Sequence, residues 1–278
     1  MTHQDKPAGR AASLTIRPQQ KTQALNIQSS AFPAQNFCYV IPEAIGSTDR
    51  TIWGAAPGTL MAPDWMQTND SGWTYAWRKE GCLEFSVHAQ PADDYLDVRI
   101  RLRNLSETAW PESLSFSCFS PRAAADFADF DGTRTFLLTD EQWTPITQIE
   151  RRDSNRPTIQ LWYLKGGPRQ LGFVDSFRAA PQVYPEAVLA VRSYDGKHVI
   201  AVTADKPLFL FSNLEFSCIH CCPSFGPLRP GEEGVATHRV FICPNTTLDQ
   251  LADRVRATVI ATWTWSSGSR TGARRRYR

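Results

Sequence analysis

The stretch YLDVRIRLRNL, residues 95–105, decides the fold class. Apolar side chains alternate with charged ones along it, Leu96, Val98, Ile100 and Leu102 against Asp97, Arg99, Arg101 and Arg103. Successive side chains of a β-strand point to opposite faces of the sheet. This period of two therefore predicts an antiparallel strand with one buried face and one face in water.

The segments around this stretch repeat its pattern. GCLEFSVHAQ at 81–90 also alternates, and the turn-forming residues 91–94 separate the two runs. Asp195-Gly196 marks a second tight hairpin. Further strands are expected at 113–120, 133–139, 158–165, 171–177, 186–194, 198–204, 207–213 and 236–243.

The best helical pattern lies late in the chain, at 246–263, where Thr246 or Thr247 can cap the first turn. Many short strands and one late helix predict an all-β fold, a large antiparallel β-sandwich with one C-terminal helix. We expect four segments, which are a disordered polar leader at 1–30, the sandwich at 31–245, the helix at 246–263 and a basic tail at 264–278.

Composition and charge narrow the class of protein. The chain has 278 residues, of which 42% are hydrophobic and 21% charged, as in a folded domain with a sizeable core. No apolar run approaches the roughly 20 residues of a membrane helix, so we expect no membrane span. The N-terminus lacks a secretory pattern, and the seven cysteines are an odd number, so we expect a cytoplasmic protein with reduced thiols.

The charge distribution argues against a specific nucleic-acid partner. The last nine residues, RTGARRRYR, contain five arginines, yet positions 31–269 contain 21 basic and 27 acidic residues. A basic tail can meet phosphate, but the acidic body behind it would repel a nucleic acid. The sequence leaves the oligomeric state open.

The stretch EFSCIHCCPSFGPLRPGEEG at 215–234 gathers three cysteines and a histidine within five positions. On a strand, alternation turns Cys218, His220 and Cys222 to one face and Cys221 to the other. Thiolates and imidazole suit zinc or copper, but no second ligand pair follows at a short, defined spacing. A redox CxxC motif normally opens a helix. We therefore interpret these residues as structural cysteines and predict no metal and no cofactor.

Tryptophan is the more informative residue type. The chain has nine tryptophans, no G-x-S-x-G motif, and no glycine-rich phosphate loop. A flat indole packs well in a core, and it also suits the apolar C–H face of a sugar ring. Tryptophans beside polar loop residues, such as Trp143, therefore favour carbohydrate binding.

Two segments resemble the aldose 1-epimerases, the galactose mutarotase-like proteins. RLRNLSETAWPESLSFSCFSP at 101–121 is similar to the family's segment in which a strand ends in Asn and the next strand carries a histidine. The segment 215–242 resembles the family's last strands, where a Leu-x-Pro-Gly-Glu turn, here residues 228–232, follows the strand of the catalytic glutamate. The resemblance implies the two-sheet supersandwich fold.

The resemblance does not bring the family's catalytic set with it. Phe116 or Ser117 stands where the family has its first histidine, and His220 stands near the position of the general base. Mutarotation requires a carboxylate base and an imidazole acid. The comparison therefore implies a protein without mutarotase activity, in which His220 opens into a hollow of the sheet.

We predict a carbohydrate-recognising β-sandwich protein, with ligand contacts from His220, Arg122, Trp143, Arg134 and Asp126. Two alternatives stay open. One is a carbohydrate-active enzyme, an epimerase or lyase, whose rearranged acid/base set includes Asp126 and Asp129. The other is a non-catalytic scaffold that binds a protein through an apolar patch. The sequence does not decide between binding and catalysis, and binding is the first hypothesis.

Overall fold

The alternating stretch at 95–105 forms strand β8 (Tyr95–Asn104) in a computed structural model of the chain. The structure describes residues 13–54, 60–139, 142–150, 156–165, 179–180 and 182–267, and of 259–267 it describes the backbone only. The four apolar residues of β8 are completely buried, and the arginines between them are exposed. The period-two interpretation of this stretch is therefore confirmed.

Strand β8 lies near the middle of a sheet that we call sheet B. Its nine described strands, in spatial order, are β11 (Gln142–Pro145), β10 (Thr135–Thr139), β14 (Leu189–Arg192), β15 (Val199–Ala204), β18 (Glu233–Cys243), β8, β7 (Leu83–Pro91), β6 (Trp73–Lys79) and β5 (Met66–Gln67). All neighbours pair antiparallel. The expected hairpin at 81–105 is confirmed, with Val87 opposite Ile100.

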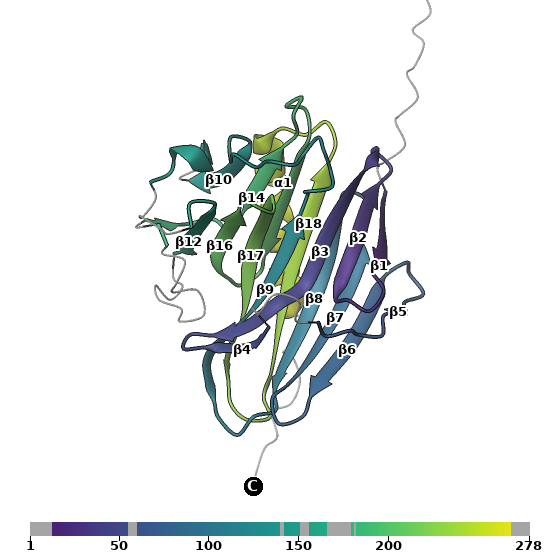
Figure 1. Cartoon of the computed structure of the whole chain (residues 1–278), viewed down its shortest axis with the longest axis vertical. Coiled ribbons are helices and arrows are strands. Elements are labelled where there is room, and N and C mark those ends of the chain that lie inside the picture. The colour runs from purple at the N-terminus through teal and green to yellow at the C-terminus, as the bar shows by residue number, and fades with distance from the viewer. Residues whose placement is uncertain are drawn as a thin grey trace, which may run out of the picture.

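A second sheet, sheet A, packs face to face with sheet B (Figure 1). Its spatial order is β1 (Leu14–Pro18), β2 (Ala24–Ser29), β3 (Phe32–Ser47), β9 (Trp110–Ser120), β17 (Cys218–Leu228), β16 (Pro207–Asn213), β12 (Ile159–Leu164) and β13 (Val183–Tyr184), with β4 (Thr51–Gly54) on β3. The pairing is antiparallel except between β12 and β13. A 3₁₀ turn, η1 (Ile146–Gln148), follows β11. The chain is thus an all-β sandwich of two large sheets.

The main core lies between the two inner faces. Phe37 and Phe119 of sheet A stack at 5.9 Å, and Phe85 and Ile100 of sheet B belong to the same cluster. All four side chains are completely buried. Burial of apolar area at about 25 cal/mol per Å² is the main force that holds two such sheets together.

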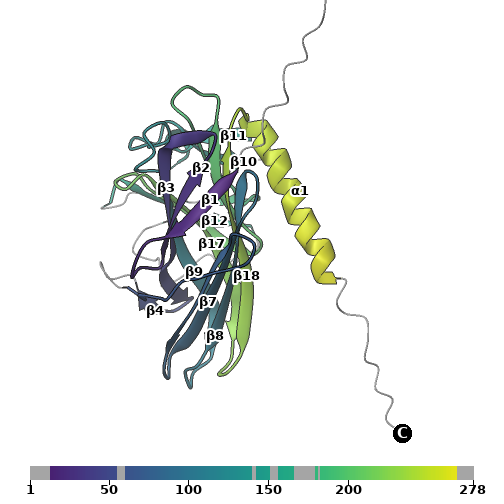
Figure 2. The same cartoon turned by 90° about the vertical axis from the view of Figure 1, so that its right-hand side faces the viewer.

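The helix α1 (Leu248–Ser267) lies across the outer face of sheet B (Figure 2). Leu251 and Val255 pack there against Ala201 and Phe241. Thr247 caps the helix: its Oγ1 accepts from the amide of Gln250 at 3.2 Å, and the side chain of Gln250 accepts from the amide of Thr247 at 2.9 Å. Among the described residues, no helix has the length and apolarity needed to cross a membrane.

The expected leader at 1–30 is wrong for its second half. Residues 14–29 form β1 and β2, which pair with each other and with β3, and Leu25 and Ile27 are completely buried. The helix continues to residue 267, four residues beyond its expected end. Residues 1–12, the expected strand at 171–177 and residues 268–278 of the expected tail at 264–278 lie outside the described residues, and residues 264–267 belong to the helix.

The outer face of sheet A carries a second apolar layer. Phe116, Phe209, Phe211 and Tyr163 gather there with Leu161. The partly buried Ala179 and Val183 pack against this layer, and Val183 belongs to the edge strand β13 of the same sheet. Both faces of sheet A are therefore apolar at its centre, which explains why β9, β16 and β17 are buried along nearly their whole length.

Candidate functional site

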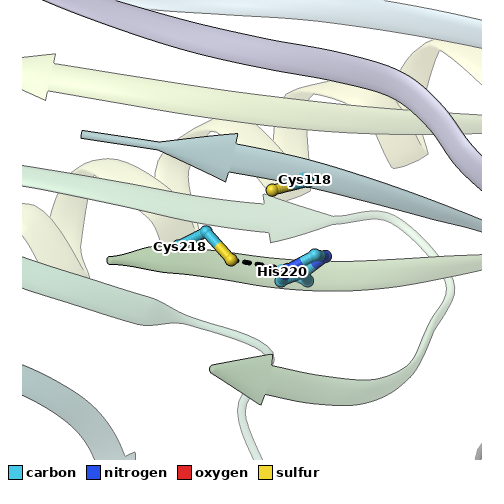
Figure 3. A group of neighbouring side chains, drawn as sticks. All are labelled: Cys118, Cys218 and His220. Carbon is cyan, nitrogen blue, oxygen red and sulfur yellow. Dashed lines mark hydrogen bonds between the residues drawn. The ribbon is translucent and has the colours of Figure 1, made fainter. Parts of the chain in front are cut away.

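A cluster of two cysteines and a histidine lies on the outer face of sheet A (Figure 3). In β17, Ile219 and Cys221 point into the main core, so Cys218 and His220 point outward. The neighbouring strand β9 adds Cys118. Ile219 pairs with Phe119, and this antiparallel register places Cys118 opposite His220. The sequence-based grouping of Cys218 with His220 is confirmed, and Cys118 joins them.

The three side chains are within metal-ligand reach of one another. The Sγ atom of Cys218 lies 3.3 Å from Nε2 of His220. The two sulfur atoms and one ring nitrogen all lie within 4.8 Å of each other. All seven cysteines of the chain are free thiols in this structure.

Aromatic rings enclose the imidazole of His220. Phe116 stacks on it with ring centroids 4.4 Å apart, and Phe211 meets it edge-on at 5.0 Å. The side chain is 1% exposed. The expectation that His220 opens into a hollow is therefore wrong, because rings from β9 and β16 cover it.

The three groups influence each other's protonation. A hydrogen bond from Cys118 and the charge of His220 lower the pKa of Cys218 to about 5, although burial opposes this. Burial lowers the pKa of His220, but the Cys218 thiolate outweighs it and the net shift is upward. Burial raises the pKa of Cys222, two residues farther along the same face. The shifts of Cys218 and His220 therefore both favour the charged forms of the pair, whereas the pKa shift of Cys222 favours its neutral thiol.

Glu43 is a further member of this region that the sequence analysis missed. The pairing of β3 with β9 is irregular between Val40 and Ala44, and the exposed Glu43 lies in this segment. The side chain is exposed at the surface, but the protein around its carboxyl takes away part of the hydration and raises the pKa of Glu43, while the nearby His220 lowers it in part. A carboxylate therefore lies at the edge of the cluster.

Trp143 lies elsewhere, in a surface pocket beside the start of α1. The pocket has a volume of about 530 Å³. Its lining includes Gln142 and Trp143 from β11, Arg192 from the end of β14, and Thr247 and Asp249 from the start of α1. The indole Nε1 of Trp143 is buried and has no hydrogen-bond partner among the described residues. The pocket combines an aromatic wall with groups of both charges.

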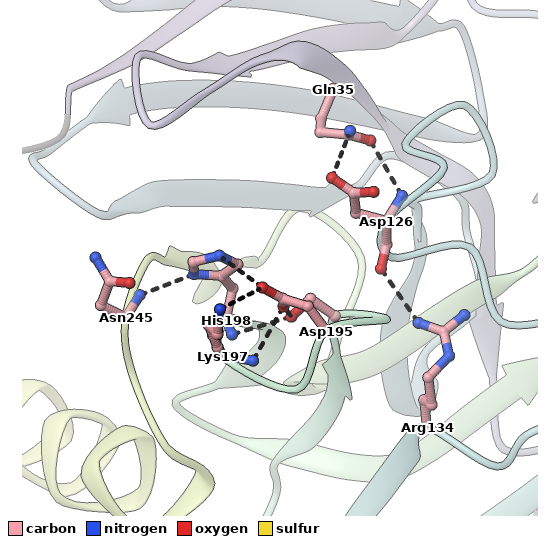
Figure 4. A network of polar contacts seen from close by, with 8 residues as sticks. Gln35, Asp126, Arg134, Asp195, Lys197, His198 and Asn245 are labelled. Atoms are coloured by element: carbon pink, nitrogen blue, oxygen red, sulfur yellow. Dashed lines mark hydrogen bonds and ion pairs between the residues drawn. The ribbon is translucent and has the colours of Figure 1, made fainter.

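Arg134 and Asp126 belong to a polar network near this pocket (Figure 4). Two hydrogen bonds join Gln35 to Asp126. Nε2 of Gln35 donates to the carboxylate of Asp126 at 2.8 Å, and the backbone amide of Asp126 donates to Oε1 of Gln35 at 3.3 Å. Arg134 donates to the carbonyl oxygens of Asp126, Ala128 and Arg192. Arg134 therefore ties the 121–134 loop to the strand end that carries Arg192 of the pocket.

The adjacent hairpin at 193–198 is part of the same network. Asp195 accepts from Ser193 Oγ at 2.7 Å, and Nδ1 of His198 accepts from the amide of Asn245 at 2.9 Å. The guanidinium of Arg134 also lies 5.9 Å from the ring of Tyr194, which is 83% exposed. These contacts fix the loops around the pocket.

The five predicted ligand contacts do not form one site. Trp143 and Arg134 are connected through Arg192, and Asp126 supports Arg134. Arg122 is exposed over the ring of Phe216, 5.7 Å from its centroid, and His220 is enclosed on the outer face of sheet A. The sequence therefore found parts of two separate regions, the pocket at Trp143 and the cluster at His220.

The carboxylates proposed for acid/base work have structural partners. Asp129 is buried and accepts from the Thr135 hydroxyl at 2.7 Å and from the amide of Arg134 at 3.0 Å. Burial raises the pKa of Asp129, whereas hydrogen bonds from Thr133 lower the pKa of Asp131 to about 2. The hydrogen bonds of Asp129, one of the two carboxylates proposed for acid/base work, and of the neighbouring Asp131 brace this loop.

Comparisons with known proteins identify the fold. No model of a protein family matches the chain, and no curated protein does. Among solved structures, a galactose mutarotase related enzyme from Lactobacillus acidophilus matches with a TM-score of 0.50 and 10% identity, over 84% of this chain and 98% of that one. The α-N-acetylgalactosaminidase NagBb from Bifidobacterium bifidum, in complex with GalNAc, matches with a TM-score of 0.50 and 13% identity.

The low identity of both matches, and the small share of the N-acetylgalactosaminidase that is covered, limit the comparison to the fold. The second match covers 91% of this chain but only 38% of the N-acetylgalactosaminidase. At 10% and 13% identity, the likeness shows the fold and not the reaction. The chain has a galactose mutarotase-like β-sandwich fold, and the resemblance seen in its sequence is confirmed at that level.

Proposed function

We propose that this chain binds a carbohydrate in the pocket beside Trp143 and does not act as a mutarotase. The observation that carries the proposal is the half-exposed indole of Trp143, whose buried Nε1 has no partner among the described residues, in a pocket of about 530 Å³. Pockets of about 300–1,000 Å³ with an aromatic wall and a few polar groups are typical of small-ligand sites. The carbohydrate-related fold supports this choice of ligand.

The lining groups have the chemistry that a sugar needs. The indole offers an apolar face to ring C–H groups, while Gln142 and Asp249 can exchange hydrogen bonds with hydroxyls. Arg192 packs over Phe136 at 5.0 Å, which limits the freedom of its guanidinium. A fixed cation favours sugars that carry a carboxylate or a sulfate.

The absence of mutarotase activity is proposed from His220. A general acid must reach the ring oxygen of the sugar. The imidazole is 1% exposed and lies between Phe116, Phe211 and Cys218. An aldose that approached the outer face of sheet A would meet phenylalanine rings before it met this imidazole.

A glycan screen of the full chain, followed by calorimetric titration of the best binder, tests the proposal. Trp143→Ala is expected to weaken binding at least tenfold. Trp73→Ala is the matched control, since Trp73 is also half-buried but lies toward the opposite edge of sheet B, with its Nε1 bonded to the carbonyl of Ile16. Equal losses in both variants, or no binding to any glycan, would contradict the proposal.

A second variant defines the class of sugar. Arg192→Gln is expected to weaken binding of uronic or sulfated sugars more than that of neutral ones, because only the former lose an ion pair. Equal affinity of this variant and the natural chain for acidic sugars would remove Arg192 from the site.

A further inference from the structure

The outer face of sheet A carries a ligand set that the carbohydrate proposal does not use. Cys118, Cys218 and His220 come from two neighbouring strands and converge on one point. They are 7%, 5% and 1% exposed, so the strands on either side hold them in place. A site built on strands is more precise than a site built on loops.

The distances fit a metal ion. Tetrahedral zinc has bonds of about 2.3 Å to sulfur and about 2.0 Å to nitrogen, which places these two ligand atoms roughly 3.5 Å apart. The observed distance from Cys218 Sγ to His220 Nε2 is 3.3 Å. The Cys118 sulfur lies within 4.8 Å of the Cys218 sulfur and of a ring nitrogen of His220, near enough to supply the third ligand.

Metal-bound histidines carry the metal on one ring nitrogen and a proton on the other, which fixes the tautomer. In His220 the metal would take Nε2, the nitrogen that lies 3.3 Å from the Cys218 sulfur, and Nδ1 would keep the proton.

We infer that Cys118, Cys218 and His220 form a binding site for a divalent d¹⁰ metal ion of the zinc type. Two sulfurs and an imidazole select a soft or borderline metal and exclude Mg²⁺ and Ca²⁺, which require oxygen ligands. Two thiolates neutralise a divalent ion, whereas a monovalent copper ion would leave one net negative charge among the rings of Phe116 and Phe211. The fourth position is left for water.

This inference replaces the expectation that these cysteines are only structural. That expectation rested on the missing second ligand pair after Cys218 in the sequence. The third ligand comes instead from Cys118, a hundred residues earlier in the chain, and only the pairing of β9 with β17 brings it to the site.

Titration of the reduced, metal-free full chain with Co²⁺ tests the inference. We expect one ion per chain, thiolate-to-cobalt charge-transfer absorption, tetrahedral d–d bands, and complete displacement by Zn²⁺. Cys118→Ser and Cys218→Ser are expected to weaken binding at least 100-fold. Cys222→Ser is the matched control: Cys222 is buried on the same face of β17, outside the ligand set, and its loss should change affinity less than threefold.

Three results would overturn the inference. The first is a natural chain that binds Co²⁺ without charge-transfer absorption, or does not bind it. The second is an equal loss in Cys222→Ser and Cys218→Ser. The third is a disulfide between Cys118 and Cys218 that is still present after the chain has been treated with a thiol reductant. If a serine variant does not fold, His220→Asn in the same titration decides, with an expected loss of at least tenfold.

Discussion

His220 and His238 are both buried histidines, but the structure places them in opposite chemical settings. His238 lies in the main core between the sheets, where its Nδ1 is 2.7 Å from the hydroxyl of Tyr39. His220 lies on the outer face of sheet A, with Cys218 at 3.3 Å. Burial lowers the pKa of His238 to about 3, and the charges of His220 and Arg239 add to this shift. The pKa of His220 is raised.

The difference between the two histidines shows that the partner decides what a buried imidazole can do. Burial raises the pKa of Tyr39 well above its usual value, so its hydroxyl stays neutral and His238 stays neutral with it. The thiol of Cys218 can release its proton, so His220 can be charged. One histidine joins the two sheets, and the other belongs to a site.

The largest expected difference in stability is between two variants in which His238 or His220 is replaced by phenylalanine. His238→Phe keeps the ring volume but leaves the Tyr39 hydroxyl without its acceptor, and should reduce the free energy of unfolding by about 2–3 kcal/mol. His220→Phe keeps the stack on Phe116 and costs only the hydrogen bond to the Cys218 thiol, a weak hydrogen-bonding group, so its effect should be about 1 kcal/mol. Urea denaturation of the metal-free chains measures both. Equal losses would contradict the assignment of His238 as the structural member.

The second effect is a pH dependence that belongs to His238. A histidine whose pKa is lower in the folded chain stabilises the fold above its unfolded pKa of about 6.5, and this contribution is lost as the pH falls toward about 3. The stability advantage of the natural chain over His238→Phe should therefore shrink by about 2 kcal/mol between pH 7 and pH 4.5. A difference that stays constant over this range would show that His238 is not held neutral.

A smaller effect is expected from the carboxylate beside His220. Glu43→Gln removes a negative charge near the cluster but none of the three ligands, so Co²⁺ affinity should fall about threefold to tenfold, far less than in Cys218→Ser. The same titration at two salt concentrations checks it, since an exposed charge acts less at high salt. A loss as large as that of a cysteine variant would make Glu43 a ligand.

The smallest effect concerns the ion pair beside His238. Arg239 Nε lies 2.7 Å from Asp97, whose side chain is 39% exposed. Asp97→Asn should reduce the free energy of unfolding by about 1 kcal/mol or less, because one partner is partly in water. Thermal unfolding at pH 7 measures it, and a loss above about 2 kcal/mol would show that the pair behaves as a buried one.

The sequence was sufficient for the fold wherever the signal is local. The alternation at 95–105 predicted which side chains of β8 are buried, and of the two caps expected, Thr246 or Thr247, the structure uses Thr247. The leader was misjudged because β1 and β2 are short and polar on one face, and their stability comes from pairing with β3. Neither segment alone contains a sequence signal for such long-range pairing.

The site was only half predictable for the same reason. Alternation placed Cys218 and His220 on one face, and this was correct. The closeness of Cys118 and the rings that enclose His220 depend on which strands are neighbours, and β9 and β17 are about a hundred residues apart. Trp143 could be selected for its aromatic face, but Asp249 of its pocket comes from the helix start.

X-ray absorption at the zinc edge of the zinc-loaded full chain tests the central claim most directly. The account predicts a first shell of two sulfur atoms at about 2.3 Å and one or two lighter atoms at about 2.0 Å. In Cys222→Ser the shell should be unchanged, and in Cys218→Ser one sulfur should disappear. A shell of oxygen and nitrogen alone, in the natural chain, would contradict the assignment of Cys118, Cys218 and His220 as a metal site.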